Sequence, residues 1–395
     1  MIDFTLTPEQ VMLQKTARDY ATNMLVPLVE RTRKTPVGDT PWPHVQPVFK
    51  AGAALGLTKI FVPEALGGMG GSCLDAVIML EELGAADVGI ASDYFSLTAT
   101  MPLLLGRAGP AGQARLADFA AAPAMVLAGA QSEPNVAGSE LLMAGPDPAY
   151  GPKLAARRKG DGWQLSGQKS AFVTNAGVAD AYCIIARSDA AKPLMEGLSL
   201  FWVPADTPGL RIGRKTPLIG WPLTSHAELY FDDVQLPADA LLSPEGGAAM
   251  LFAMVPEMPV CLAATFVGLA RAAMDYALVY AKDRKSMGRP IAQHQAVALK
   301  LAEMAVEVHG ARLLVWDAAA ACATDPMAAA MFKAPAAKAK AVDAAIRNAQ
   351  LCVEILGGYG VTREYDAGRF LNDAWIGYSR DFTRDVLMLG IAQGL

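Results

Sequence analysis

The feature that most constrains the fold of this chain is a change of residue pattern along its length, from helical to strand-like and back. The first third carries apolar residues at helical spacing, separated by Gly and Pro, around residues 44–56, 72–85 and 94–107. From about Ala124 the segments become short and rich in β-branched and aromatic residues, with turn dipeptides such as Asp161-Gly162 between them. After Ser243 long helical patterns return. The order helices, strands, helices predicts an α+β chain with separate helical and β domains.

We divide the chain on this pattern into helical residues 1–123, β residues 124–241 and helical residues 242–395. A length of 395 residues is enough for such a set of domains. The first helix should begin at Thr7-Pro8, because Pro suits the first turn of a helix. The last long helix should be perturbed at Pro335 and end at Gly357-Gly358, where glycine suits a C-terminal cap.

Composition excludes several classes of protein. A net charge of −5 provides no basic surface for nucleic acid, and the low charged fraction of 18% suggests burial in an oligomer. The five cysteines form no CxxC pair and the four histidines show no metal-ligand spacing, so we expect no disulfides and no metal site. The first ten residues lack the pattern of an export signal, and no uncharged apolar run is long enough to span a membrane. We therefore expect a cytoplasmic protein.

The segment RKSMGRPIAQHQ, from Arg284 to Gln295, lies between two helical patterns. It combines guanidinium and amide donors with a helix start, and such donors suit the pyrophosphate of a dinucleotide. A solvated basic turn is the alternative. The segment SEPNVAGSE, from Ser132 to Glu140, combines small residues with hydroxyls, which suits either close approach to a cofactor or a capped turn at a strand end. We interpret GGMGGS, which ends at Ser72, as a packing turn, because it lacks the strand-turn-helix context of a phosphate loop.

The chain resembles the acyl-CoA dehydrogenase family over essentially its whole length. The resemblance is carried by four sequence motifs that occur in the family's order: FVPEALGGMGGS (61–72), SEPNVAGSE (132–140), GQKSAFVTNAG (167–177), and RKSMGRPIAQHQ (284–295) followed by EILGGYG (354–360). The resemblance implies an N-terminal α-helical domain, a central β-barrel-like domain and a C-terminal four-helix bundle. It also implies non-covalent FAD, an acyl-CoA substrate from fatty acid or lipid metabolism, and an electron-transfer flavoprotein as partner. The assembly would be a tetramer, a dimer of dimers, either homomeric or heteromeric.

The resemblance assigns several residues to FAD and CoA. Ser132 would approach the flavin ring, and Ser139 the CoA side. Phe172 matches the aromatic residue beside the isoalloxazine, and Thr174 matches the hydroxyl near the reactive flavin nitrogen. Both segments that carry these residues are one residue longer than the commonest family spacing, and an ordinary strand is the alternative for the second.

In the family a second subunit completes the FAD site. By matching, Arg284 and Gln295 would hold the neighbour's FAD, while Gly357 and Gly358 would allow close backbone approach. Two positions depart from the usual pattern. Met287 stands where the family usually has Phe, and Glu354 stands where Gln is common.

The family's base is usually a Glu followed by Gly-Thr, and the matching residues here are Asp381, Phe382 and Thr383. Asp381 keeps a carboxylate that is one methylene shorter, and Thr383 keeps the hydroxyl. Phe382 replaces a glycine and should crowd the thioester or reshape the acyl pocket. The alternative for this stretch is a charged helix start, with Asp381 or Ser379 as the cap.

Two other acids are candidates. Glu257 lies within one residue of the point where a branch of the family places its base, although it could be only a first-turn acid. Asp93 falls on the helix that lines the far end of the acyl pocket in this family. It would suit a polar or cyclic acyl group there, or an elimination that uses a second carboxylate; a surface Asp is the alternative.

The lead hypothesis is therefore an FAD-dependent dehydrogenase for an atypical acyl-CoA, whose acyl group is cyclic, branched or polar. A flavin-dependent monooxygenase of the same fold is a second hypothesis. A non-catalytic subunit of a heteromeric acyl-CoA dehydrogenase is the third.

Overall fold

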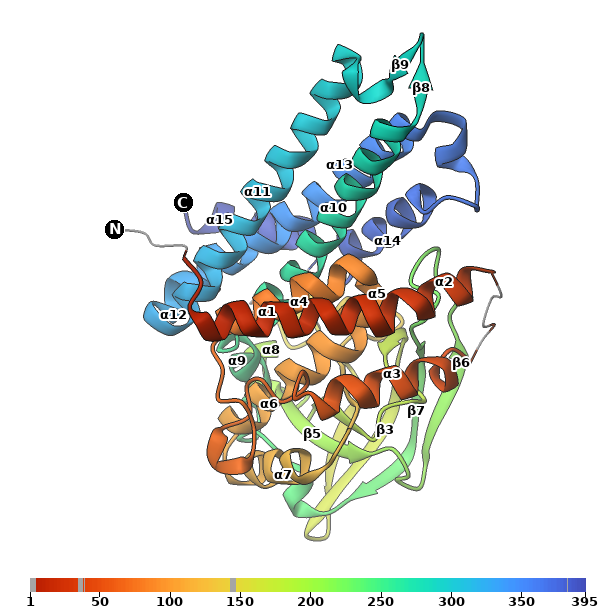
Figure 1. Ribbon diagram of the computed structural model, residues 1–395. Coiled ribbons are helices and arrows are strands. Elements are labelled where there is room, and N and C mark those ends of the chain that lie inside the picture. Colours follow the sequence, from red (N-terminus) through yellow and green to blue (C-terminus); the bar gives the residue numbers. More distant parts are fainter. Residues whose placement is uncertain (1–4, 35–37, 39, 143–146, 382) are drawn as a thin grey trace.

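The computed structural model describes residues 5–34, 38, 40–142, 147–381 and 383–395. In Figure 1 the N-terminal helices, coloured red and orange, lie against a sheet coloured yellow and green. The long helices of the last third, coloured cyan to blue, extend above both. The three-part architecture expected from the sequence is confirmed.

All the regular elements in the described part of the N-terminal domain are helices. Its elements are α1 (Pro8–Tyr20), η1 (Ala21–Leu25), α2 (Val26–Lys34), α3 (Trp42–Ala54), η2 (Glu64–Leu66), α4 (Cys73–Ala86), α5 (Val88–Ile90), η3 (Ala91–Ser96), α6 (Leu97–Arg107) and α7 (Pro110–Ala121). Helix α1 begins as predicted, because the Thr7 side chain and Gln10 form a capping box. The GGMGGS segment is a packing turn: a Cβ on Gly68 would fall 2.1 Å from the backbone oxygen of Val62.

Helices α5, η3 and α6 form one continuous stretch from Val88 to Arg107 with a π-helical turn in its middle. Such turns often occur at functional sites, because they rotate side chains out of the ordinary helical register. Helix α4, which precedes this stretch, crosses α10 of the last domain at a small-residue contact. A Cβ on Gly84 would lie 2.3 Å from the backbone oxygen of Thr265, and one on Gly268 would lie 2.3 Å from that of Glu81. Helix α4 is thereby fixed against the last domain, and η3, which carries Asp93, also contacts α10.

The central domain is a curled seven-stranded sheet. Its strands are β1 (Leu127–Ala130), β2 (Ala155–Lys159), β3 (Gly162–Thr174), β4 (Ala181–Arg187), β5 (Leu198–Pro204), β6 (Leu210–Lys215) and β7 (His226–Leu236). Their order is β1-β4-β2-β3-β7-β6, with β5 on β4. The pairing of β3 with β7 places Thr174 opposite His226 and shifts register between Lys169 and Val173. From Lys169 to Val173 strand β3 advances four residues while β7 advances two, so the irregularity there accommodates two extra residues of β3.

Three short helices accompany the sheet, namely η4 (Gly138–Leu142), α8 (Leu194–Gly197) and η5 (Ala238–Ala240). The last domain contains α9 (Ala248–Ala253), α10 (Glu257–Asp283), β8 (Lys285–Ser286), β9 (Arg289–Pro290), η6 (Ile291–Gln293), α11 (Gln295–Thr324), α12 (Pro326–Ala328), η7 (Ala329–Lys333), α13 (Ala334–Leu356), η8 (Gly357–Val361), α14 (Ala367–Ser379) and α15 (Arg384–Gln393). Helices α10, α11, α13 and α14 pack as the bundle. The perturbation predicted at Pro335 is the π-helical turn η7, and α13 ends at Gly357, whose φ is +59°.

Two helical stretches, Val88–Arg107 and Glu257–Asp283, are long and apolar enough to cross a membrane by composition alone. Within the fold, 89% and 61% of their apolar windows are buried. This burial is typical of core helices, and their apolar character is explained by the packing described above.

Candidate active site

A pocket forms where the three domains meet. The helical stretch Val88–Arg107, the sheet, helix α10 and the turn after α14 each contribute to its wall. Its polar lining residues are Ser92, Ser96, Thr100, Gln131, Thr174, Arg380 and Asp381, and its apolar side chains are Leu97, Met101, Met258 and Leu262. Two residues predicted from the sequence, Thr174 and Asp381, are therefore brought to one cavity from positions far apart in the chain.

Asp381 lies on the turn between α14 and α15, and its φ is +28°. One carboxylate oxygen, Oδ2, accepts a hydrogen bond of 3.1 Å from Nε of Arg380. Helix α15 begins after Thr383, and no capping bond from Asp381 occurs among the described residues. The structure therefore places Asp381 at the pocket and not at a helix cap. Phe382, expected to reshape the acyl pocket, lies outside the described residues.

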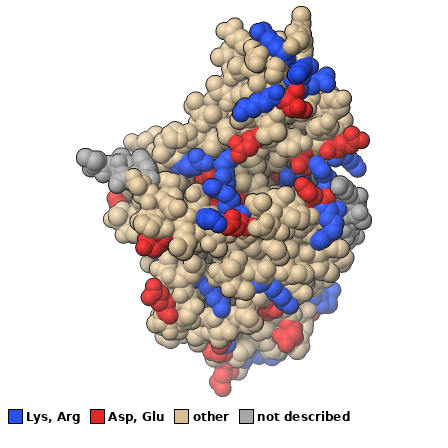
Figure 2. Space-filling model, viewed as in Figure 1, with Lys and Arg blue, Asp and Glu red and all other residues tan. Residues whose placement is uncertain are grey.

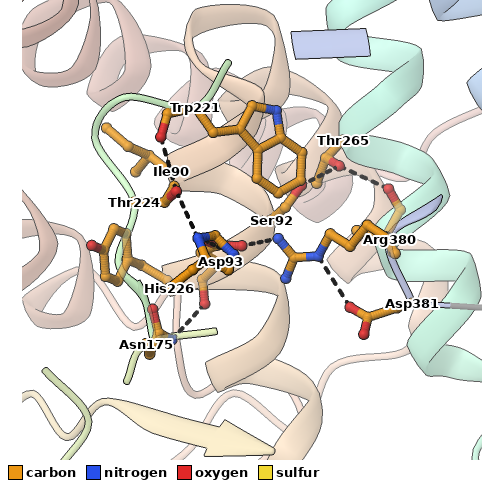
Figure 3. Close-up of polar contacts among 12 residues, drawn as sticks. Ile90, Ser92, Asp93, Asn175, Trp221, Thr224, His226, Thr265, Arg380 and Asp381 are labelled. Atoms are coloured by element: carbon orange, nitrogen blue, oxygen red, sulfur yellow. Dashed lines mark hydrogen bonds and ion pairs between the residues drawn. The ribbon is translucent and has the colours of Figure 1, made fainter. Parts of the chain in front are cut away.

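Asp93 is fully buried, so the interpretation of it as a surface residue is wrong. Its Oδ1 forms an ion pair with Nη1 of Arg380, and Figure 3 shows the guanidinium between the two carboxylates of Asp93 and Asp381. The Arg380 guanidinium also lies 4.7 Å from the ring centre of Trp221. Buried charges persist when they are paired, and here Arg380 supplies the countercharge that Asp93 requires.

The sequence alone did not reveal His226 or Arg380. Nε2 of His226 lies 3.4 Å from Oδ2 of Asp93. Burial lowers the pKa of His226 to about 4, so its ring is neutral near pH 7. The charge of Asp93 is therefore balanced by Arg380 and not by the imidazole. A coupling between residues 93, 226 and 380 has no local sequence signal, because the three lie on separate domains.

A second buried cation, also not predicted, supports the turn that carries Asp381. Lys338 on α13 has no exposed surface and donates to the backbone oxygens of Gly377 and Arg380, at 2.7 and 3.2 Å. Burial lowers the pKa of Lys338 to about 8, against the opposing effect of the Asp381 charge. Lysine at this site is a C-terminal cap for α14.

The residues expected near a flavin lie at or just after the C-terminal ends of strands β1 and β3. Phe172 has 62% of its surface exposed, and Thr174 lines the pocket. Ser132 and Ser170 share a hydroxyl–hydroxyl bond of 2.6 Å, which ties the segment after β1 to β3. Ser139 belongs to η4, and its side chain lies outside the described part of the chain.

A buried ion pair holds the same segment. Lys169, which is fully buried, lies 2.9 Å from Glu133 and donates to the backbone oxygen of Gln131 at 3.1 Å. Glu133 in turn accepts from the backbone N–H groups of Lys153 and Leu154. Ser132 is therefore held on a rigid element.

The RKSMGRPIAQHQ segment forms the hairpin β8–β9 and the start of α11, at the free end of the bundle (Figure 1). Met287 is at its tip, 89% exposed and with a φ of +49°. Arg284 lies 5.9 Å over the ring of Tyr359, which joins this segment to EILGGYG. Within one chain, neither Arg284 nor Gln295 lines the pocket of Asp381.

The surface beside this hairpin is open. A Cβ on Gly357 or Gly358 would meet no atom within 4 Å, so packing inside the described chain does not require glycine at either position. Glu354, the unusual acid, forms an ion pair with Lys300. Its charge is therefore compensated within the same chain.

Glu257 is the first residue of α10 and does not line the pocket. It forms a bidentate ion pair with Arg107, at 2.6 and 2.9 Å. The next residue, Met258, does reach the pocket. Thr383 precedes α15 and lies outside the pocket lining. Among the residues that the structure describes, no group of three His, Cys, Asp or Glu side chains could hold a metal ion.

Three family models match: acyl-CoA dehydrogenase N-terminal domain over residues 7–115, middle domain over 128–234 and C-terminal domain over 247–395. The chain is 34% identical over 384 residues to the short-chain specific acyl-CoA dehydrogenase of Bos taurus mitochondria, covering 96% of this chain and 88% of that protein.

Two solved structures illustrate the range of similar proteins. Butyryl-CoA dehydrogenase from Megasphaera elsdenii has a TM-score of 0.89 at 28% identity and covers 100% of this chain and 99% of its own. Nitroalkane oxidase from Podospora anserina has a TM-score of 0.90 at 25% identity, with 100% and 96% coverage. The fold is therefore similar to that of proteins that act on chemically different substrates.

Proposed function

The chain belongs to the acyl-CoA dehydrogenase family, and from this premise we propose that it dehydrogenates an acyl-CoA thioester between its α- and β-carbons, with Asp381 as base. It is an oxidoreductase of this family, with FAD as cofactor. The observation that carries the proposal is that Asp381 and Thr174 line one pocket. Asp381, the proposed base, and Thr174, which matches the hydroxyl near the reactive flavin nitrogen, would then face the same substrate.

The residues present fit FAD. Phe172 offers an exposed ring beside the pocket, and Thr174 offers a hydroxyl at its wall. Gly357 and Gly358 leave space beside the Arg284 hairpin, where a dinucleotide can approach the backbone. When bound, FAD supplies the acceptor for the β-hydrogen, which leaves as hydride.

Asp381 would take the α-proton of the thioester. Its Oδ2 is held by Nε of Arg380, while no hydrogen bond to Oδ1 occurs among the described residues. One oxygen is thus oriented and the other can accept the proton, as a general base requires. The backbone N–H of Asp381 would stabilise the charge that develops on the thioester oxygen.

The FAD site would be shared between two subunits. Arg284, Gln295 and Met287 lie at the far end of the bundle from the pocket of their own chain, so they would act on a neighbour's cofactor. This arrangement supports a dimer of dimers, homomeric or heteromeric. Ser132 and Ser139 would approach flavin and CoA from the sheet side, and Thr383 would contact the flavin from the turn.

The acyl group is proposed to be atypical, that is cyclic, branched or polar, because a buried Asp93–Arg380 pair borders the pocket. Electrons would pass to an electron-transfer flavoprotein. The proposed setting is lipid metabolism in the cytoplasm.

Anaerobic titration of the FAD-loaded protein with a panel of acyl-CoAs tests the reaction. At least one thioester should bleach the flavin absorbance and yield the matching enoyl-CoA. A protein that binds FAD firmly and is bleached by no thioester contradicts the proposal.

The second candidate function is a flavin-dependent monooxygenase of this fold, since a nitroalkane oxidase, which acts on a substrate other than an acyl thioester, shares the fold at 25% identity. A flavin-dependent monooxygenase would consume oxygen when supplied with reduced flavin, with or without acyl-CoA. A non-catalytic subunit of a heteromeric enzyme would lose nothing from Asp381→Asn, whereas a dehydrogenase would lose its proton transfer.

A further inference from the structure

The guanidinium of Arg380 retains one nitrogen for the substrate. Nη1 pairs with Asp93 and Nε donates to Asp381. Among the residues that the structure describes, Nη2 has no hydrogen-bond partner, and it is not among the buried atoms that lack one. Figure 3 shows this nitrogen with no dashed line to any neighbour. Because Arg380 lines the pocket, its Nη2 is a donor open to the acyl group.

A second polar atom faces the same space. Ser96 is 4% exposed and lines the pocket, yet its hydroxyl has no partner within the described parts of the chain and is not a fully buried atom. Ser92 and Thr100, one turn to either side, also line the pocket but are occupied, by Thr265 at 2.9 Å and by the backbone oxygen of Ser96 at 2.9 Å. This stretch of the helix therefore presents one free hydroxyl to the acyl group.

Helix α10 contributes two apolar side chains to the pocket lining, Met258 and Leu262. A plain alkyl chain would leave Arg380 Nη2 and the Ser96 hydroxyl without partners, at a desolvation cost for each. An acyl group with one polar edge can pair with Arg380 and Ser96 and still pack its apolar part against Met258 and Leu262.

The charges decide which polar group fits. Asp93 already neutralises Arg380, and Asp381 must be ionised to act as base. A substrate carboxylate would therefore add a second uncompensated negative charge, whereas a neutral oxygen adds none. We propose that the substrate is an acyl thioester whose acyl chain carries an uncharged oxygen acceptor, such as a hydroxyl or a carbonyl, bound by Arg380 Nη2 and Ser96 Oγ. This inference rests on the proposed function.

Binding of reaction products tests the inference without turnover. Crotonyl-CoA, 4-hydroxycrotonyl-CoA and fumaryl-CoA share four acyl carbons and end in a methyl, a hydroxyl and a carboxylate. Calorimetric titration of the FAD-loaded protein should give a Kd for the hydroxyl compound about 10- to 100-fold lower than for the methyl compound, as for a hydrogen bond to a charged group. The carboxylate should bind at least about 10-fold more weakly than the hydroxyl. Fumaryl-CoA that binds as tightly as the hydroxyl compound overturns the proposal.

Variants connect the preference to its residues. Arg380→Met should abolish the preference for the hydroxyl compound, and Ser96→Ala, which disturbs no ion pair, should reduce it. Arg384→Met is the matched control, because Arg384 lies just beyond the same turn and pairs with Asp343, outside the pocket. A preference that survives both pocket variants overturns the proposal. An equal loss of affinity for all three compounds in Arg380→Met assigns Arg380 to the thioester and also overturns it. Flavin bleaching by acyl-CoAs is recorded in parallel, so a failure of the proposed function is seen separately.

Discussion

The ammonium group of Lys338 lies 2.7 Å from the backbone oxygen of Gly377, at the C-terminal end of helix α14. Arg380 and Asp381 follow this helix end directly, so a buried cation on α13 fixes the start of the turn that carries the proposed base. The positive charge is also favourable at a helix C-terminus, where backbone carbonyls lack partners.

Lys338→Met should therefore lower the rate of flavin reduction by acyl-CoA, because the carboxylate of Asp381 loses its fixed position. A displacement of about 1 Å can cost roughly 100-fold in rate. Rapid-mixing absorbance measurements give this rate apart from substrate affinity. Lys333→Met is the control, since Lys333 pairs with Asp317 at the surface. Equal rates in the two variants would remove the positioning role.

Asp381→Asn should reduce the rate of flavin reduction by about 10²- to 10⁴-fold, the usual contribution of a general base. FAD content and thermal stability should stay near those of the unmodified protein, because the Asp381 side chain is 41% exposed and has a single hydrogen-bond partner. Glu257→Gln provides the comparison between the two candidate bases. If Glu257→Gln shows the larger loss of rate at normal FAD content, the assignment of the base moves to α10.

The main features of the fold were predictable because each domain has its own residue pattern. The apolar periodicity of the bundle helices and the β-branched runs at residues 181–187 and 226–231 are local signals, and the corresponding elements occur. Strands β2 and β6 were not predicted, since Arg and Lys dominate both and neither alternates clearly. The hairpin β8–β9 was predicted only as a loop, because four residues carry too little pattern.

The candidate site was predictable only where a residue matches a family motif. Asp381 and Thr174 came from such motifs, and the structure places both at one pocket. Arg380 is adjacent to a matched residue, but in the sequence it is only one member of a charged run, residues 380–385. Its role depends on Asp93, which lies 287 positions earlier in the chain. A contact between side chains so far apart depends on tertiary packing and leaves no local periodicity.

His226 should make stability depend on acid pH. Its pKa of about 4 in the folded protein lies below the ordinary 6.5, so the unfolded chain binds more protons between these values. Stability is therefore unaffected above pH 6.5 and is lost as pH falls from 6.5 to 4, by roughly 3 kcal/mol in total. His226→Gln should flatten the decline of Tm over this window in scanning fluorimetry. His44→Gln, at an exposed position, should leave the decline of Tm over this window unchanged. An unchanged decline in His226→Gln would show that other groups control acid stability.

A shared FAD site predicts that two defective chains can complement each other. Arg284→Met should impair the contact that the β8–β9 hairpin makes with the FAD of the neighbouring subunit. Thr174→Val combined with Phe172→Ala should impair the contacts that a subunit makes with the FAD at its own pocket. Each homomeric variant should retain little FAD. Co-expressed chains that mix at random should regain about a quarter of the normal FAD content, because half of the dimers carry one intact site of two. Absence of any recovery in purified mixed dimers would show that one chain supplies the whole site.

The Asp93–Arg380 pair allows a test of its energetics by a double-mutant cycle. Asp93→Asn leaves the buried Arg380 with only the carboxylate of Asp381, which is 41% exposed, and breaking a buried pair costs about 3–5 kcal/mol. Tm should fall markedly in Asp93→Asn. The double variant Asp93→Asn with Arg380→Met removes both charges and should recover most of the loss, because an uncharged pair of similar volume is often as stable as the ion pair. The cycle separates coupling from the separate effect of each residue. Additive losses in Tm would mean that Asp93 and Arg380 are not coupled, and Asp381 would then be the partner that keeps Arg380 charged.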